Sequence, residues 1–401
     1  MGSEAGARVS VAGSGDYVIR VLEDPLALDA AAWDALLALQ AQPTPFMAHA
    51  YLAALHRSGS AGPGTGWTPR YLALLDPAGR LRAACPLYLK SHSRGEYVFD
   101  WGWAQAHARA GLPYFPKAVI AVPFTPVPGS RLLADSPHSR AALIEAARQW
   151  CAAQGLSSLH LLFGDAADLQ TCADAGLMQR PTVQFHWHNR SPQPYRDFDD
   201  FLAALTQDKR KKIRQERRKV REAGVTVTVR EAAAITPDDW DFFYRCYVRT
   251  YLEHGNPPYL QRSFFIELDR TQAAHWLLFI AERAGRPIAS SLVAIGQPHG
   301  LPVAWGRYWG ALERVDCLHF ELCYYSPLQW CIEHRYSRFE GGAQGEHKLA
   351  RALLPVVTPS AHWLAHPELA SAVGRSLARE EAAIDDYLAL LAQHSPLRSA
   401  D

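Results

Sequence analysis

The sequence predicts an α/β protein made of two related modules in tandem. The order hairpin, strand, helix, strand occurs twice, at about residues 70–163 and 276–341. A length of 401 residues is long for one domain and suits two. The content of 48% hydrophobic and 20% charged residues is typical of a soluble globular protein.

The first module should span residues 17–190, after a small, polar and disordered tail at 1–16. We expect an aromatic strand at Tyr97–Trp103. Because Gly111–Arg131 contains many prolines, we expect no central strand or helix there. The other predicted elements are helices at Asp29–Leu39, Phe46–His56, Arg140–Ala153 and Ala166–Ala175, and strands at Arg70–Asp76, Leu81–Leu89, Ser158–Phe163 and Val183–Asn189.

The second module should span residues 191–401. It opens with a basic helix at 207–222 and closes with an amphipathic helix at 367–393, whose apolar residues recur at helical spacing. Between them we expect the strand Val225–Val229, helices at Asp238–His254, Phe264–Arg270 and 318–335, the hairpin Trp276–Arg283 with Ile288–Ile295, and strands at Val303–Gly310 and Arg338–Gly341.

The expected compartment and cofactor content are inferred from motifs that the sequence lacks. It has no signal peptide and no apolar run long enough to span a membrane, so we expect a cytoplasmic protein without a membrane span. Its seven cysteines are odd in number and form no Cys-x-x-Cys motif, which argues against disulfide frameworks and cysteine-rich zinc sites. We expect no metal and no tightly bound cofactor.

The basic helix is the strongest electrostatic feature of the sequence. The run KRKKIRQERRKVR, Lys209–Arg221, holds nine basic residues and one acid, a local charge of +8 in a chain whose net charge is +1. On a helix, Lys211, Arg214 and Arg218 share one face, where they could bind phosphates. A solvated helix is the simpler alternative, but only Glu216 is present to relieve repulsion among the cations. We therefore predict a phosphate-bearing ligand, and tRNA, coenzyme A and nucleotide sugars all remain candidates.

Acid–base chemistry is concentrated in RFEGGAQGEHKLAR, residues 338–351. Glycines allow close approach to a ligand, while carboxylate and imidazole groups transfer protons. We predict Glu340, Glu346 and His347 as catalytic candidates, and Gln344 and Lys348 as substrate-binding residues. The alternative is a glycine-rich turn with solvated charges.

The strand WGRYWG, residues 305–310, should contribute to the same site. Glycine within a strand often marks a bulge or a close approach of the backbone. Regular alternation would place Arg307 and Trp309 on one face and Tyr308 on the other, and we predict that all three bind substrate.

The helix after this strand provides a positive N-terminus for phosphate. His319 and Glu321 lie near its start, and we predict that both bind substrate. Pro327 either kinks one long helix or occupies the first turn of a shorter one, with Ser326 and Gln329 as a capping pair.

The segments KRKKIRQERRKVREAGV, WGRYWG, HFELCYY, FEGGAQGEHKLAR and SAHW together resemble the FemAB-like family, which is related to the Fem aminoacyltransferases and, more distantly, to the GNAT acyltransferases. The resemblance implies two tandem GNAT-like modules, each a mixed central sheet flanked by helices. It further implies that backbone N–H groups of a bulged strand hold the donor carbonyl, and that Glu340 matches an acid of the Fem proteins. Glu346, His347 and Lys348 have no clear Fem counterpart.

We therefore expect an N-acyltransferase that moves an acyl group directly from acyl-CoA, as co-substrate, to a small-molecule or peptide amine. One alternative is aminoacyl transfer from tRNA, which would make tRNA a partner. Another is a non-catalytic module that binds a cell-wall precursor or nucleic acid. The sequence leaves the oligomeric state open.

Overall fold

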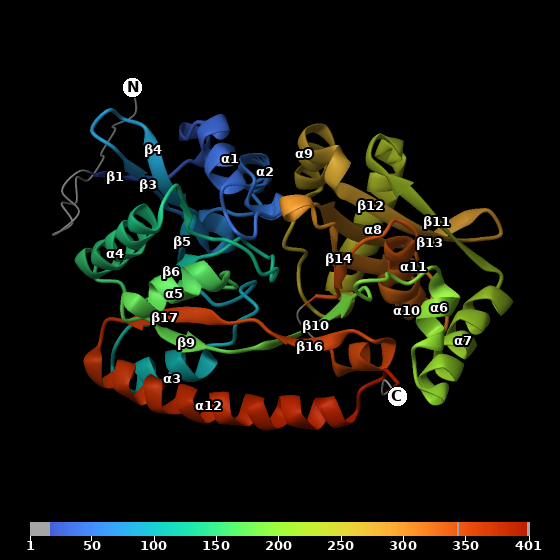
Figure 1. The fold of residues 1–401 in the computed structure, drawn as a ribbon. Helices are drawn as coiled ribbons and strands as arrows, with labels where there is room; N and C mark the ends of the chain where they lie inside the picture. Colours follow the sequence, from blue (N-terminus) through green and yellow to red (C-terminus); the bar gives the residue numbers. More distant parts are fainter. Residues whose placement is uncertain (1–16, 343–344, 399–401) are drawn as a thin grey trace. The chain divides into compact units, whose positions relative to one another are not determined.

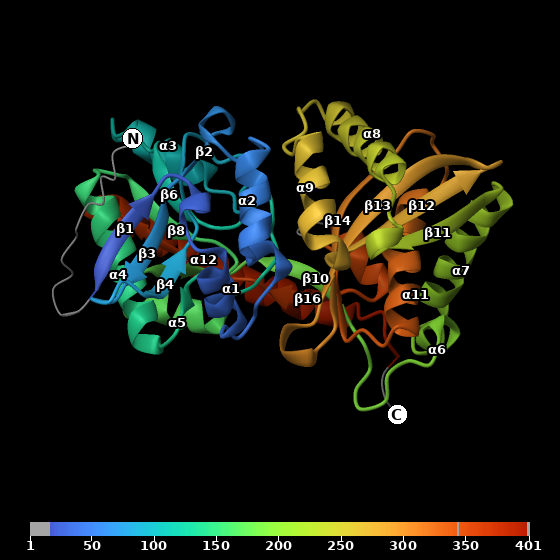
Figure 2. The same ribbon diagram turned by 90° about the horizontal axis from the view of Figure 1, so that it is seen from above.

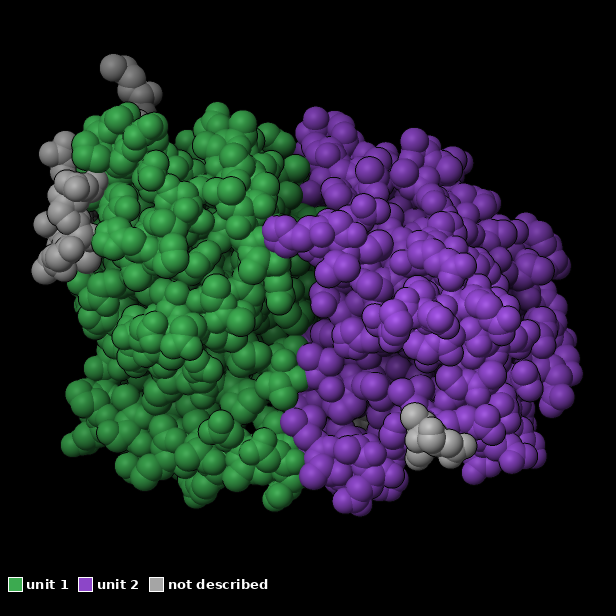
Figure 3. Space-filling view, viewed as in Figure 1, with its two compact units in different colours: residues 1–182, 357–386 green, residues 183–356, 387–401 purple. Residues whose placement is uncertain are grey.

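The structure is a computed structural model that describes residues 17–342 and 345–398, with only the main chain of Glu346. The predicted tail at 1–16 lies outside the described residues. The chain forms two compact units, residues 1–182 with 357–386 and residues 183–356 with 387–401 (Figure 3). These units differ from the continuous modules 17–190 and 191–401, because residues 183–190 belong to unit 2 and residues 357–386 belong to unit 1.

Unit 1 contains two sheets. The four-stranded sheet has the order β1 (Val18–Leu22), β3 (Tyr71–Leu75), β4 (Leu81–Cys85) and β7 (Leu133–Ala134). The six-stranded sheet has the order β2 (Trp67–Pro69), β5 (Leu87–Lys90), β6 (Lys117–Ile120), β8 (Ser158–Leu161), β17 (Ser360–Leu364) and β9 (Met178–Arg180). The helices are α1 (Ala30–Ala38), α2 (His49–Arg57), α3 (Trp101–Arg109), α4 (Pro137–Ala153) and α5 (Ala166–Asp174).

Two predictions for unit 1 were wrong. Tyr97 has a left-handed backbone with φ 61°, which interrupts the expected strand, and helix α3 begins at Trp101. The proline-rich segment contains β6, which pairs with β5 on one side and with β8 on the other. The prolines lie outside this strand, at Pro116 and Pro123, so they remove no donor from its ladders.

Unit 2 is built on one seven-stranded sheet. Its order is β11 (Val225–Glu231), β12 (Trp276–Arg283), β13 (Arg286–Gly296), β14 (Val303–Ala311), β15 (Arg338–Glu340), β10 (Val183–His188) and β16 (Leu354–Val357). The helices α8 (Pro237–Glu253) and α9 (Arg262–Gln272) cover one face (Figures 1 and 2). The other face carries α6 (Phe198–Ala203), α7 (Gln207–Glu222), α10 (Leu318–Phe320) and α11 (Ser326–Glu333). The basic helix thus has its predicted bounds.

The two larger sheets share one plan, in which each takes a strand from a distant part of the sequence. Strand β8 runs parallel to β6 and antiparallel to β17, which lies near the end of the chain. Strand β15 runs parallel to β14 and antiparallel to β10, which comes from the first half. We call this arrangement the strand exchange.

The predicted C-terminal helix is present as α12 (Pro367–Gln393). Val373 and Leu377 are buried in a small cluster with Trp103 of unit 1, and Leu391 is buried in the core of unit 2. The apolar spacing read from the sequence therefore corresponds to buried contacts.

Candidate active site

A pocket opens in unit 2 where the parallel strands β14 and β15 separate. Their pairing ends at Trp305 and Glu340, and the next residues of the two strands, Gly306 and Gly341, line the pocket. Its volume is about 140 Å³, and the other lining residues are Ser291, Leu292, Val293, Arg307, Tyr308, Trp309, His319, Cys323, Tyr324 and Gly342. Four of the predicted substrate-binding residues, Arg307, Tyr308, Trp309 and His319, therefore meet at one site.

Strand β14 is bulged at Arg307. Tyr308 pairs with Leu292 and Gly306 pairs with Val293, so Arg307 is the extra residue between them. The Arg307 Nη2 donates to the Tyr308 hydroxyl at 3.2 Å, and the guanidinium lies 5.0 Å from that ring. The expected alternation, with these two side chains on opposite faces, was therefore wrong because the bulge turns them toward each other.

The segment after β14 forms one continuous helical run rather than a short capped helix. Helix α10 follows Cys317, which has a left-handed backbone with φ 66°, and a π-helical turn, Glu321–Tyr325, joins it to α11. Pro327 lies just beyond this turn, which corresponds to the kinked alternative. Ser326 donates to the Glu321 carboxylate at 2.9 Å instead of capping a helix.

The π turn brings Tyr324 beside His319, with their rings 5.6 Å apart, although five positions separate them in the sequence. The Tyr324 hydroxyl lies 3.1 Å from Nε2 of His347, whose side chain is exposed. Partial loss of hydration, together with the charges of Arg351 and Lys348, lowers the pKa of His347, so its imidazole is neutral near pH 7. Tyr324, which lines the pocket, is therefore in hydrogen-bonding distance of an exposed imidazole.

Sequence reasoning did not select Tyr324. A spacing of five residues places two side chains on different faces of a regular helix, and only the π turn aligns them. The aromatic pair YY before Ser-Pro was the one available signal. His319, which was selected, is half-buried, and desolvation lowers its pKa to about 4, so it lines the pocket as a neutral group.

Glu340 lies at the last paired position of β15. Side chains alternate along a strand, so Glu340 projects away from Phe339, which packs in the core with Tyr324. Its carboxyl group is buried, and this desolvation raises its pKa to about 7 against the opposing effect of Arg338. The Arg338 Nε lies 3.0 Å from Oε1, and His186 Nε2 lies 3.9 Å from Oε2. Glu340 therefore lies on the opposite face of the sheet from Tyr324 and does not itself line the pocket.

The remaining predicted site residues have other placements. The Lys348 ammonium is buried and donates to the carbonyl of Gly342 at 2.8 Å, so it holds the glycine loop. Glu321 accepts hydrogen bonds from Arg217 at 2.9 and 3.1 Å and does not line the pocket. Gln344 lies outside the described residues, and only the main chain of Glu346 is described.

A wide groove lies along the basic helix α7, and its volume is about 920 Å³. The predicted phosphate-binding residues Lys211, Arg214 and Arg218 all line it. An adjoining groove of about 440 Å³ shares four of its lining residues and continues along β11. The lining of the large groove also includes Arg210, Arg217 and Arg221, with Asp197, Asp199 and Glu333 as its acids.

The single acid of the basic run does not relieve repulsion within α7. Glu216 is buried and accepts from Arg351 and from the Tyr325 hydroxyl. Two exposed cations instead have acidic neighbours outside the run, with Arg214 3.5 Å from Asp199 and Arg218 3.6 Å from Glu222.

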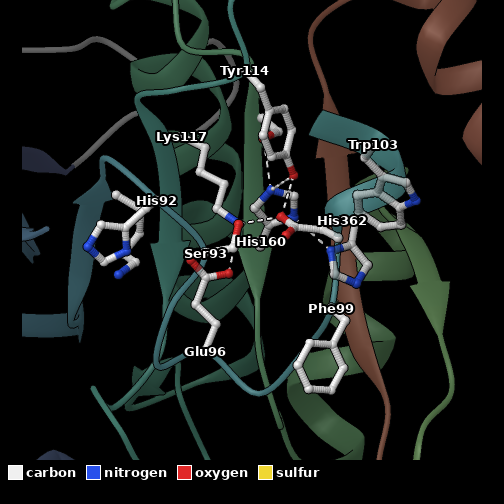
Figure 4. Close-up of polar contacts among 12 residues, drawn as sticks. His92, Ser93, Glu96, Phe99, Trp103, Tyr114, Lys117, His160 and His362 are labelled. Atoms are coloured by element: carbon white, nitrogen blue, oxygen red, sulfur yellow. Dashed lines mark hydrogen bonds and ion pairs between the residues drawn. The ribbon is translucent and has the colours of Figure 1, made fainter. Parts of the chain in front are cut away.

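Unit 1 contains a second polar cluster that sequence reasoning missed (Figure 4). Lys117 of β6 donates to Glu96 at 2.7 Å and forms a close ion pair with Asp100. The Tyr114 hydroxyl donates to Asp100 at 2.5 Å and lies 3.3 Å from His160. These residues come from several separate segments, including the two whose elements were wrongly predicted, so no sequence spacing reveals the cluster.

Comparison with known proteins identifies the family. A family model described as FemAB-like, peptidoglycan biosynthesis/recognition, matches residues 26–399. The chain belongs to the FemAB-like family. This confirms the predicted family and, with it, the general class of acyl- or aminoacyltransferases. No curated protein matches this FemAB-like chain.

Solved structures resemble this FemAB-like protein at low sequence identity. The C-terminal domain of a putative lysylphosphatidylglycerol synthetase from Agrobacterium fabrum has a TM-score of 0.51 at 11% identity, covering 86% of this chain and 95% of that one. The lysylphosphatidylglycerol synthetase from Bacillus licheniformis has a TM-score of 0.48 at 11% identity, over 84% and 98% of the two chains. A tandem GNAT protein from the clavulanic acid biosynthesis pathway has a TM-score of 0.46 at 14% identity, over 88% and 99%. The first likeness supports the predicted mixed α/β fold.

Among the helices that the structure describes, none has an apolar stretch of the length that a lipid bilayer requires.

Proposed function

We propose that unit 2 transfers an acyl or aminoacyl group directly to an amine in the pocket between β14 and β15. The observation that carries this proposal is the Tyr324–His347 pair, because it connects a small lined pocket to an exposed neutral imidazole. The bulge at Arg307 interrupts the ladder between β14 and β13, which leaves backbone N–H groups for a developing oxyanion.

Such a transfer has two stages, removal of a proton from the amine and delivery of a proton to the leaving group. The amine nitrogen attacks the donor carbonyl and loses a proton, which Tyr324 takes while passing its own hydroxyl proton to Nε2 of His347. The bond to the leaving group then breaks, and the leaving atom needs a proton. We assign this second step to Glu340, whose raised pKa of about 7 keeps much of it protonated at neutral pH.

Acyl-CoA is the first candidate donor, since its acyl group fits a small pocket and its phosphates suit the cations of α7. The size of the basic groove favours a second candidate, aminoacyl-tRNA. The lining cations from Arg210 to Arg221 extend over roughly 16 Å of helix at about 1.5 Å per residue, enough to meet several phosphates of a polynucleotide. A peptidoglycan precursor is the candidate amine acceptor, consistent with the family description.

Thermal melting of the full-length protein with coenzyme A, uncharged tRNA and aminoacyl-tRNA tests the donor. A bound donor raises the melting temperature by mass action. Stabilisation by coenzyme A supports acyl-CoA, whereas stabilisation by tRNA that collapses between 50 and 200 mM salt, the range over which phosphate contacts weaken, supports aminoacyl-tRNA. No shift with any of them would leave the protein without a donor, and the non-catalytic alternative would then replace this proposal.

A further inference from the structure

The two large sheets carry a buried pair of ionisable residues at the same position. In unit 1, His160 of β8 is directly opposite His362 of β17. In unit 2, Glu340 of β15 is directly opposite His186 of β10. In both cases the second residue lies on the strand supplied by the strand exchange.

The sequence around the exchanged histidines is also similar. His362 and His186 are each followed by a tryptophan and preceded by an apolar residue, in AHW and FHW. Trp363 lies opposite Leu159, and Trp187 lies opposite Phe339. The histidine is therefore a shared feature of the two sheets, and only the residue that it faces differs.

The pair in unit 1 is closed. The Nδ1 atoms of His160 and His362 are 2.7 Å apart, so one ring donates to the other (Figure 4). Each Nε2 atom has a serine hydroxyl 2.8 Å away, from Ser158 for His160 and from Ser360 for His362. Both rings are fully buried and have partners at both nitrogens.

The pair in unit 2 is incomplete. Oε2 of Glu340 is buried and has no hydrogen-bond partner among the described residues. Nε2 of His186 lies 3.9 Å from this oxygen and 3.3 Å from the Gln184 side-chain oxygen. The Trp305 side chain, directly opposite Glu340 on β14, also favours the ionised carboxyl by hydrogen bonding. A carboxylate oxygen left without a donor in the interior is costly, and a small rotation of either side chain supplies one.

We propose that His186 is a positioning residue for Glu340, which holds the ionised carboxylate by donating its Nε2–H to Oε2. This inference rests on the proposed role of Glu340 in proton transfer. When Glu340 gives its proton to the leaving group, the negative charge that remains is shared between Arg338 at Oε1 and His186 at Oε2. His186 stays neutral throughout, and no proton moves to it.

The surrounding charges are consistent with a neutral His186. Burial, together with the nearby Arg338, His188 and Lys348, lowers the pKa of His186 to about 3. Glu340 itself faces Arg338 and Arg307, which favour its ionised form. A neutral imidazole can still donate one N–H, which is all that the proposal requires.

Infrared titration of the full-length protein without substrates tests the pair. The carboxyl C=O band of Glu340 is identified by its loss in Glu340→Gln, and its pH midpoint is then followed in three variants. His186→Phe keeps an aromatic ring but no donor, and should raise the midpoint by about one pH unit or more. His186→Gln keeps an N–H and should stay near the wild-type value. His188→Phe, on the same face of β10 opposite Arg338, should not shift it.

A midpoint that is the same in folded His186→Phe and wild type would overturn the proposal. If His186→Phe does not fold, ¹⁵N NMR of the wild-type protein decides instead. We expect a neutral His186 with its proton on Nε2 and a signal that moves as Glu340 ionises, and a proton on Nδ1 would contradict the proposal. These outcomes are separable from the proposed function, because full transfer activity in Glu340→Gln would remove Glu340 from the reaction without changing the midpoints.

Discussion

Arg351 donates to both carboxylate oxygens of Glu216, at 2.9 and 3.1 Å, so the one acid of the basic run is bound to a residue 135 positions away. The Arg351 guanidinium also lies 3.5 Å from the centre of the Phe320 ring. Helix α7 is therefore fixed against the segment that follows β15 by a buried ion pair.

Loss of this pair should destabilise unit 2. Breaking a buried pair leaves an uncompensated charge, so Arg351→Met should lower the free energy of unfolding by about 3 kcal/mol or more, measured by urea denaturation. The double variant with Glu216→Gln should be less than additive, because the second change removes the stranded charge. As a control, Glu222→Gln alters an exposed acid beside Arg218 and should cost less than about 0.5 kcal/mol. Equal losses in Glu222→Gln and Arg351→Met would contradict this role.

Cations that line the basic groove should contribute more to the affinity for the donor than cations elsewhere on the same helix. The triple variant Lys211→Ala, Arg214→Ala and Arg218→Ala should weaken binding of the donor at low salt, measured by titration calorimetry, and the loss should shrink as salt rises. The matched control replaces Lys209, Lys212 and Lys219, which do not line the groove. If both variants lose the same affinity, the net charge of the helix, and not a specific phosphate site in the groove, accounts for binding.

The Tyr324–His347 pair should act as a unit. His347→Ala should reduce turnover about 100-fold or more, the usual contribution of a general base, with little change in melting temperature. Tyr324→Phe should have a similar effect, and the two losses should not add. Tyr325→Phe is the control, because that hydroxyl bonds Glu216 and does not face the pocket. Full turnover in His347→Ala would show that the base lies elsewhere.

The pH dependence of turnover should reflect His347. A base must be unprotonated, and the pKa of His347 is lowered from its ordinary 6.5. Activity should therefore persist below pH 6.5 and fall only as pH drops through the lowered value. Steady-state rates between pH 5 and 8 measure this acid limb, and an acid limb with its midpoint well above pH 6.5 would argue against His347. A separate fall in rate as pH rises through about 7 is expected, because Glu340 must be protonated to act as the acid.

Glu340 should make stability depend on pH. Its pKa rises from 4.5 to about 7 on folding, so the folded state binds this proton more tightly than the unfolded chain. The resulting stabilisation is complete below pH 4.5 and is lost as pH rises through about 7. Glu340→Gln has no such proton to lose. The difference in melting temperature, variant minus wild type, should therefore be more positive at pH 8 than at pH 5. A difference that does not vary with pH would mean that Glu340 titrates normally.

The sequence predicted those features that depend on local chemistry. The apolar spacing of 367–393 and the bounds of the basic helix needed only helical periodicity, and the glycines of WGRYWG indicated a bulge near Arg307. The position of Pro327 left two alternatives for this segment, one long kinked helix or a shorter helix that begins at Pro327, and the structure contains the first.

Other features depend on contacts that no local pattern contains. Strand β6 is only four residues long between prolines, and its place in the sheet comes from neighbours on both sides. Tyr324 reaches the pocket only because of a π turn. Glu216 was expected to offset the charges of its own helix, because its actual partner, Arg351, is distant in sequence. The facing of His186 and Glu340 follows from the strand exchange, which links residues 154 positions apart.

The strand exchange also determines when each sheet can finish folding during synthesis of the chain. His160 and His362 are 202 positions apart, so during synthesis β8 waits for its partner until nearly all of unit 2 has left the ribosome. Strand β9 waits equally long, because its pairing in the sheet is with β17. Unit 1 therefore passes through translation with an open edge, the kind of surface on which nascent chains aggregate and chaperones act. A chain that stops before residue 360 contains every strand of the unit 2 sheet, but its unit 1 sheet lacks β17.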